Sequence, residues 1–397
     1  MRIVMIDGFR GFFLFFMMII HANMLLRAVA GKLNHHYFGW VEDAQGFVFI
    51  SGMVVALVYG RIKMRQGDEA MGGAIRKRMR TIYSHQAGLI LILLAVALFT
   101  QAAFGFTSPS LQIYTREPVG FALASLLLVT GSNHMGILPM YIIFMSVMPL
   151  VLRLMHRGYL MSLLTVSVLL WLAAQSGLGE YLVAQAEAAL AAKGVTIPLG
   201  IYFNPLGWQV LFFSGAFFGY LMSVGRLDLS MFDRRDAFFA FLIGLVGFLA
   251  LGVYDRLAFG ALLPPDVIAA IMAPVNRGNL SILYVVTFAL DLFLVVWLVR
   301  AGRECGVRMA EIASRFVTWF FTRPALVFLG QHSLHVFSAH ILVFYALDLL
   351  LMFYRPGTLA ANVIVLLTPL PLYAAAWGHA SWTRMQKGRL SLGSGAA

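Results

Sequence analysis

The sequence predicts an all-α polytopic membrane protein, a bundle of about ten transmembrane helices. Hydrophobic residues make up 61% of its 397 residues and charged residues only 12%, whereas a soluble domain is nearer half apolar and a quarter charged. The mean hydropathy is +0.85, and the apolar residues gather in long runs separated by short polar segments. No internal repeat and no linker rich in Pro, Gly or Ser interrupts this pattern. We therefore expect residues 1–397 to form a single integral membrane domain.

The first predicted helix follows the opening MRIVMIDGFR. Asp7 and Arg10 precede its apolar run and no small-residue cleavage site follows it, so we expect this helix to be retained rather than removed as a signal peptide. Nine further apolar runs are long enough to cross a bilayer. The ten predicted spans are 11–27, 46–61, 84–104, 137–152, 161–177, 206–223, 237–253, 279–299, 324–350 and 361–383.

The apolar segment 119–131 decides the predicted topology. Its thirteen residues are too few for a normal crossing, which needs about 20. If it does not cross, 22 of the 29 Lys and Arg residues fall on one side of the membrane, as expected for cytoplasmic segments. If it crosses, the basic stretch 300–323 falls outside. The charge count therefore predicts both termini in the cytoplasm, with 119–131 as a re-entrant or surface helix on the outer side.

Charge and cysteine content narrow the classes of partner. The net charge of +12 resides in short segments between spans, where Lys and Arg set orientation, so it does not indicate nucleic acid. The single cysteine, Cys305, excludes an internal disulfide framework. We predict no bound metal, and the sequence does not indicate an oligomeric state.

Ionisable residues in the first helix indicate a functional site. Asp7, Arg10 and His21 are three and eleven residues apart, spacings that return side chains to one helical stripe. Such groups are costly inside a membrane and often mark a site. Asp7 has ion-pair spacing to Arg10 and lies fourteen residues from His21, so we expect it to pair with Arg10.

Two further histidines have a similar predicted depth. His340 lies sixteen residues beyond Pro324, and His134 lies at the outer start of the span beginning at Ile137. With His21, these residues belong to the outer half of the bundle on the predicted map. A structural role is the alternative for any one of them, but three at similar depth favour a site.

A basic cluster precedes the third span on the predicted cytoplasmic side. It contains Arg76, Lys77, Arg78 and Arg80. These residues could be a topology signal alone, or guanidinium groups that bind phosphate oxygens together with Arg10. No glycine-rich phosphate loop occurs in the sequence. A nucleotide bound by arginines, such as coenzyme A, therefore fits better than a hydrolysed triphosphate.

Five sequence blocks spread over most of the chain resemble the OpgC family. They are IDGFRG with His21 beyond it, GFVFISGMVVALVYGR at 46–61, LPMYIIF at 138–144, FNPLGWQ at 203–209 and FLGQHSLHVFSAH at 328–340. The resemblance implies an inner-membrane succinyltransferase that modifies osmoregulated periplasmic glucans. It also implies a relation to the wider acyltransferase-3 group of transmembrane sugar acylases.

In that wider group the first helix carries Asp, Arg and His, which Asp7, Arg10 and His21 match. A late Gly-x-x-Ser-x-x-x-x-x-His pattern is matched by Gly330, Ser333 and, offset by one residue, His340. Two motifs depart from the group. Its Arg-x-x-Arg pair reads Lys77-x-x-Arg80 here, with Arg78 between, and its His-x-Trp-Ser-Leu segment has neither Trp nor the nearby Glu around His134.

The resemblance implies transfer of a succinyl or other acyl group from cytoplasmic acyl-CoA to hydroxyls of a periplasmic glucan. We expect His21 to accept the hydroxyl proton, because an unperturbed imidazole is largely neutral near pH 7. His340 would orient the sugar or polarise the carbonyl, with His134 as a third candidate catalytic residue. Coenzyme A would be held by Arg10, Arg78, Arg80 and Lys77. Succinyl-CoA is a co-substrate, and no permanently bound cofactor is expected.

Two other classes of function stay open. A transporter or flippase for a glycan or small polar solute would use the same polar stripe, but predicts inverted repeats and helices broken near the midplane. A purely structural membrane protein would explain the composition, but not the aligned Asp, Arg and His. The expected location is the bacterial inner membrane, in contact with lipid.

Overall fold

The architecture was obtained from a computed structural model that describes residues 3–38, 42–259 and 262–393. Over these residues the chain is helical throughout, and the only β-pairing is an isolated bridge between Thr130 and Gly200. Eight helices are long and apolar enough to cross a membrane, or up to ten if each of two bent helix pairs forms one span. The all-α polytopic prediction is confirmed.

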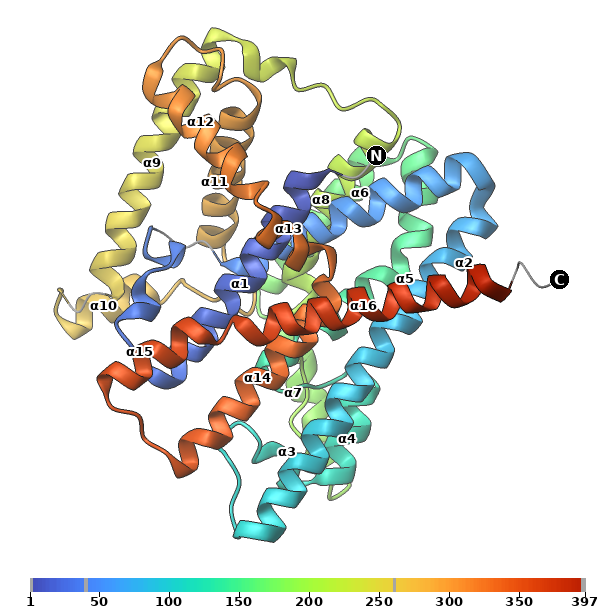
Figure 1. The fold of residues 1–397 in the computed structure, drawn as a ribbon, viewed down its shortest axis with the longest axis vertical. Helices are drawn as coiled ribbons and strands as arrows, with labels where there is room; N and C mark the ends of the chain where they lie inside the picture. The colour runs from blue at the N-terminus through green and yellow to red at the C-terminus, as the bar shows by residue number, and fades with distance from the viewer. Residues whose placement is uncertain (1–2, 39–41, 260–261, 394–397) are drawn as a thin grey trace. The chain divides into compact units, whose positions relative to one another are not determined.

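The helices form two compact units, which are coloured along the chain in Figure 1. The terminal unit comprises Met1–Asn34 and Arg315–Ala397, and the central unit comprises His35–Ser314. Each is described by itself. That residues 1–397 form a single integral membrane domain stays a prediction.

The terminal unit is built around α1 (Val4–Leu26). Its other helices are α13 (Pro324–Gln331), α14 (Ser333–Phe353), α15 (Thr358–Leu367) and α16 (Leu370–Gly393). α13 and α14 replace the single predicted span 324–350, because His332 leaves the helical conformation at φ −110° and ψ 24°. The two helices still follow one another along α1, so the predicted crossing has a break rather than an end.

Glycines bring α1 and α13 into backbone contact. A Cβ atom at Gly11 would overlap with the carbonyl oxygen of Leu326, and one at Gly330 would overlap with that of Asp7. Near the start of α1, the rings of Phe9 and Phe321 stack with centroids 3.7 Å apart. Small residues permit this close approach. In lipid there is no hydrophobic driving force for helix association, so dispersion forces between closely packed helices stabilise the contact.

The directions of these helices follow from their contacts. Later residues of α1 contact later residues of α13 and α14, so α1 runs parallel to these two helices. α15 lies at the C-terminal end of α1, where the Ala30 amide donates to Asn362 Oδ1 over 2.7 Å. His379 of α16 contacts His332 at the start of α14. The chain therefore returns along α16 to the end of the unit at which α1 begins.

The central unit is organised by α2 (Asp43–Phe104), a helix of 62 residues. It contains both the second and the third predicted spans, joined through a kink at Gly67, whose φ of 85° is accessible to glycine. Its first half packs on α8 (Pro205–Ser223) at Gly52 and Gly215, where a Cβ atom would overlap with a carbonyl oxygen of the other helix.

The remaining elements complete the central unit. They are η2 (His35–Phe38), α3 (Ile113–Arg116), α4 (Pro118–Leu126), η3 (Asn133–Met135), α5 (Ile137–His156), α6 (Leu160–Gln175), α7 (Leu178–Ala191), η4 (Ser230–Asp233), α9 (Arg235–Phe259), α10 (Pro265–Met272) and α11 (Ile282–Arg300). Two elements are not confined to the central unit: η1 (Ala30–Lys32) follows α1 in the terminal unit, and α12 (Arg308–Phe321), which contains the unit boundary at Arg315, meets α13 at a 51° bend. Helix α4 within the segment 119–131 has nine residues, about 14 Å at 1.5 Å per residue, which is too short to cross.

Candidate functional site

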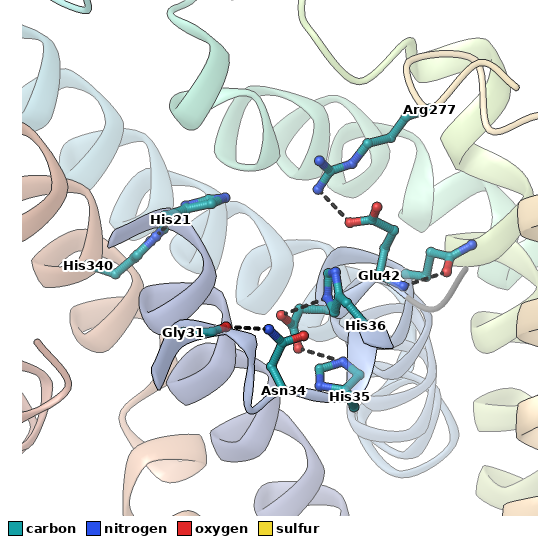
Figure 2. Close-up of polar contacts among 10 residues, drawn as sticks. His21, Gly31, Asn34, His35, His36, Glu42, Arg277 and His340 are labelled. Carbon is teal, nitrogen blue, oxygen red and sulfur yellow. Dashed lines mark hydrogen bonds and ion pairs between the residues drawn. The ribbon is translucent and has the colours of Figure 1, made fainter. Parts of the chain in front are cut away.

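Two histidines distant in sequence meet inside the terminal unit. His21 Nδ1 of α1 lies 2.8 Å from His340 Nε2 of α14, within hydrogen-bond distance (Figure 2). His340 is fully buried, whereas His21 is only partly buried. One imidazole donates this hydrogen bond and the other accepts it, and either ring can be the donor, depending on its tautomer.

Arg10 contacts Ser333 on the same two helices, nearer the start of α1 and of α14. The guanidinium NH2 of Arg10 donates to Ser333 Oγ over 2.5 Å. Ser333 is buried, and Arg10 is partly buried. This hydrogen bond holds the permanently charged guanidinium of Arg10 at the interface between α1 and α14.

The late sequence pattern contacts the first helix at each of its three positions. Gly330 packs against the backbone of Asp7 and Gly11, Ser333 binds Arg10, and His340 binds His21. The parallel direction of the helices causes this register. The structure therefore brings His21 and His340 together, as a site built from both motifs requires. Asp7 is buried, and its predicted ion pair with Arg10 stays a prediction.

A second group of histidines lies at the start of α14. His332 Nδ1 is 2.7 Å from His379 Nδ1, and the rings of His335 and His379 stack with centroids 3.6 Å apart. The spacing of His332 and His335 places them on one helical face, but nothing in the sequence relates them to His379, 44 or more residues later.

The predicted basic cluster lies on the second half of α2 in the central unit. Lys77 and Arg80, which align with the Arg-x-x-Arg pair of the wider group, are both exposed. Arg78 between them is partly buried and interacts electrostatically with Tyr59. Arg78 is thus the better-positioned member of this cluster for directional binding.

His134 lies in η3, immediately before α5, and is partly buried. It belongs to the central unit, whereas His21 and His340 belong to the terminal unit. The role of His134 stays a prediction.

Polar residues at the start of α2 form a group that the sequence prediction did not include. Arg277 NH2 contacts Glu42 Oε2 over 2.6 Å. Burial opposes the charge of Arg277, but the Glu42 carboxylate outweighs it and raises the pKa of the guanidinium. His35 and His36 both contact the buried Asp43. Burial also opposes protonation of His36, but its hydrogen bond to Asp43 and the charges of Asp43 and Glu42 raise its pKa.

The available signal for this group was the pair of adjacent histidines followed by an acidic residue within ten positions. It was weak, because the sequence alone does not show which of these residues face one another. Figure 2 shows His35, His36, Glu42 and Arg277 with their contacts.

Comparison with known proteins supports the inference from the motifs. No curated protein and no solved structure matches the chain. The sequence profile described as OpgC protein, in contrast, matches residues 2–385. That range contains both helices of the histidine pair and every block of the resemblance. The chain belongs to the OpgC family, whose members modify glucans by acyl transfer.

Proposed function

We propose that the chain transfers a succinyl group from cytoplasmic succinyl-CoA to hydroxyl groups of an osmoregulated periplasmic glucan. The observation that carries this proposal is the contact between His21 and His340. Transfer from a thioester to a sugar hydroxyl needs a base for the hydroxyl proton. An imidazole held by a second imidazole is suited to this task near neutral pH.

The reaction balances with the chain's own groups. The hydroxyl proton passes to Nε2 of His21 as the hydroxyl oxygen attacks the thioester carbonyl. The carbon–sulfur bond then breaks, and the proton passes on to the coenzyme A thiolate. This sequence forms the ester and regenerates a neutral imidazole.

The 2.8 Å contact is compatible with the tautomer that this role requires. For His21 Nε2 to accept a proton, its Nδ1 must carry a hydrogen and donate it to His340 Nε2. The resulting imidazolium keeps that hydrogen bond, as in a triad whose third member orients the base. His340 is fully buried, so we assign it to positioning His21 rather than to contacting the sugar.

The donor would be bound by positive charge at the cytoplasmic side. We assign Arg10, Arg78, Arg80 and Lys77 to the phosphates of coenzyme A, since guanidinium forks bind phosphate oxygens in pairs. Arg10 and Ser333 lie on the same helix pair as His21 and His340. The pantetheine arm, extended along that pair, would carry the thioester from Arg10 toward His21.

The His21→Ala variant tests the assignment. We expect succinyl substitution of isolated glucans, measured by mass spectrometry, to fall by about 10²-fold or more, the usual contribution of general base catalysis. Protein level in the membrane fraction should not change. The matched control is His156→Ala, which removes an exposed histidine at the end of α5.

Normal succinyl content in the His21→Ala variant would contradict the assignment. Loss of succinyl content in both variants would show a general loss of expression or folding. If glucans of the wild-type strain carry a different acyl group, the proposed mechanism stands, but the acyl donor is not succinyl-CoA.

A further inference from the structure

Two imidazoles of the central unit are directed at one buried carboxylate. His35 Nε2 lies 3.2 Å from Asp43 Oδ1, and His36 Nε2 lies 3.3 Å from Asp43 Oδ2 (Figure 2). The ligand atoms of all three residues lie within 4.8 Å of one another. The Asp43 side chain is 4% exposed and those of His35 and His36 are 20% and 22% exposed. The ligating nitrogens and oxygens themselves are buried, at the inner side of these partly exposed rings.

We propose that His35, His36 and Asp43 bind a divalent transition-metal ion of the zinc type. Imidazole nitrogen together with a carboxylate is a common donor set for this ion. With metal–ligand distances of about 2.0–2.1 Å, a tetrahedral centre has ligand–ligand edges of about 3.3 Å. Each histidine nitrogen lies at about that distance from a different oxygen of Asp43, so one of the two contacts forms an edge of the centre when Asp43 binds through a single oxygen.

The charges around the group also favour a cation. Glu42 and Asp255 interact electrostatically with His36, so together with Asp43 three carboxylates face the histidines. Arg277 and Arg256 supply two positive charges, the first on Glu42 and the second near Asp255. A bound dication offsets the remaining negative charge on Asp43.

The position of the ligands indicates a structural role. Asp43 is the first residue of α2, and the histidines are the first two residues of η2. A metal bound by all three would join η2 to the first turn of α2. Since neutral imidazole is the ligating form, it would fix both rings with Nε2 toward the ion.

Metal content of the full chain tests this proposal directly. The protein is purified in detergent without an oligohistidine tag, stripped with a chelator and dialysed against Zn²⁺. We expect about one Zn²⁺ per chain by plasma mass spectrometry, as for other sites of this donor set. The His35→Gln/His36→Gln double variant should retain little or none.

The matched control is Cys305→Ser, which removes the only cysteine of the sequence and should keep the full stoichiometry. A second measurement does not depend on a folded variant. Co²⁺ added to the stripped wild-type protein should give the visible absorption bands of tetrahedral cobalt, and Zn²⁺ should abolish them. Zn²⁺ should also raise the unfolding temperature of the wild type.

Wild-type protein with no metal above the dialysis buffer would overturn the proposal, as would unchanged metal content in the double variant. Cobalt spectra typical of octahedral coordination by water and oxygen would overturn it too. None of these measurements depends on acyl transfer, so their outcome is separate from that of the proposed function.

Discussion

On the proposed mechanism, His21 and His340 share general base catalysis: His21 accepts the proton and His340 positions His21. The two side chains differ in exposure. The partly buried ring can meet a substrate, while the fully buried ring can meet only protein. In that mechanism, the first ring donates a hydrogen bond to the second, which leaves its accessible nitrogen free of hydrogen. On the proposed mechanism, the identity of residue 340 matters only for its acceptor atom.

Substitution of His340 tests this division. The oxygen of a glutamine side chain can replace Nε2 as acceptor, whereas phenylalanine has a similar volume and no acceptor. We expect His340→Gln to keep much of the activity and His340→Phe to lose about 10²-fold in kcat, with little change in KM for the acyl donor. The rates are measured on purified protein with acyl-CoA and glucan. Equal losses in the two variants would assign His340 a packing role instead.

At this scale the sequence predicted His21 and His340 but not the contact between them. Depth along each helix could be counted from the chain, but the rotation of one helix against the other could not. The contacts of His332, His335 and His379 were not predictable, because they join the start of α14 to α16, with a loop and α15 between the two helices. His35 and His36 were missed for a similar reason.

At the scale of the element, α1 and α13 pack through backbone atoms. Gly11 and Gly330 leave no room for a side chain. The helices therefore have one register, and that register sets which residues of α14 lie opposite Arg10 and His21. The contact between the two histidines therefore depends on glycines, which have no reactive side chain.

The Gly11→Ala variant tests the importance of this contact. Its Cβ atom would meet the backbone of Leu326, which cannot move aside as a side chain can. We expect a loss of about 1–3 kcal/mol in stability, as for other overpacked sites, seen as a lower unfolding temperature in detergent. Gly378→Ala in α16 is the matched control, because nothing lies within 4 Å of its Cβ position. Alanine there should be neutral or slightly stabilising. Equal behaviour of the two variants would contradict the packing argument.

Hydropathy predicted where helices lie but not where they break. Gly67 in α2 and His332 between α13 and α14 both interrupt long helical runs. Neither is marked by proline, and glycine alone is too frequent in this chain to mark a kink, with 37 present. Breaks of this kind depend on what each half of the helix packs against.

At the scale of the whole molecule, the predicted topology determines which side of the membrane each segment faces. Within the terminal unit, α1 and α13–α14 are parallel, so Arg10 and Arg323 lie toward the same end of the helix pair. That arrangement requires an even number of crossings between them. On the predicted map, in which the segment 119–131 does not cross, eight predicted spans lie between them, and this topology stays a prediction.

Labelling of introduced cysteines tests the map. In a Cys305→Ser background, we expect an impermeant maleimide to label a Leu262→Cys variant in intact spheroplasts, and a Met231→Cys variant only after lysis. Both positions are well exposed, at 70% and 61%, so reactivity reports sidedness rather than burial. The reverse pattern would mean that 119–131 crosses.

The helical continuity of α2 has a consequence for how its basic residues can vary. Positive charges that merely orient a membrane protein can sit in a loop of any length. Here Arg76, Arg78 and Arg80 are held on a rod that continues from Gly67 into the next span. One inserted residue before Arg76 would turn all three by about 100° and advance them by about 1.5 Å. The length of this segment is therefore fixed as firmly as its charge.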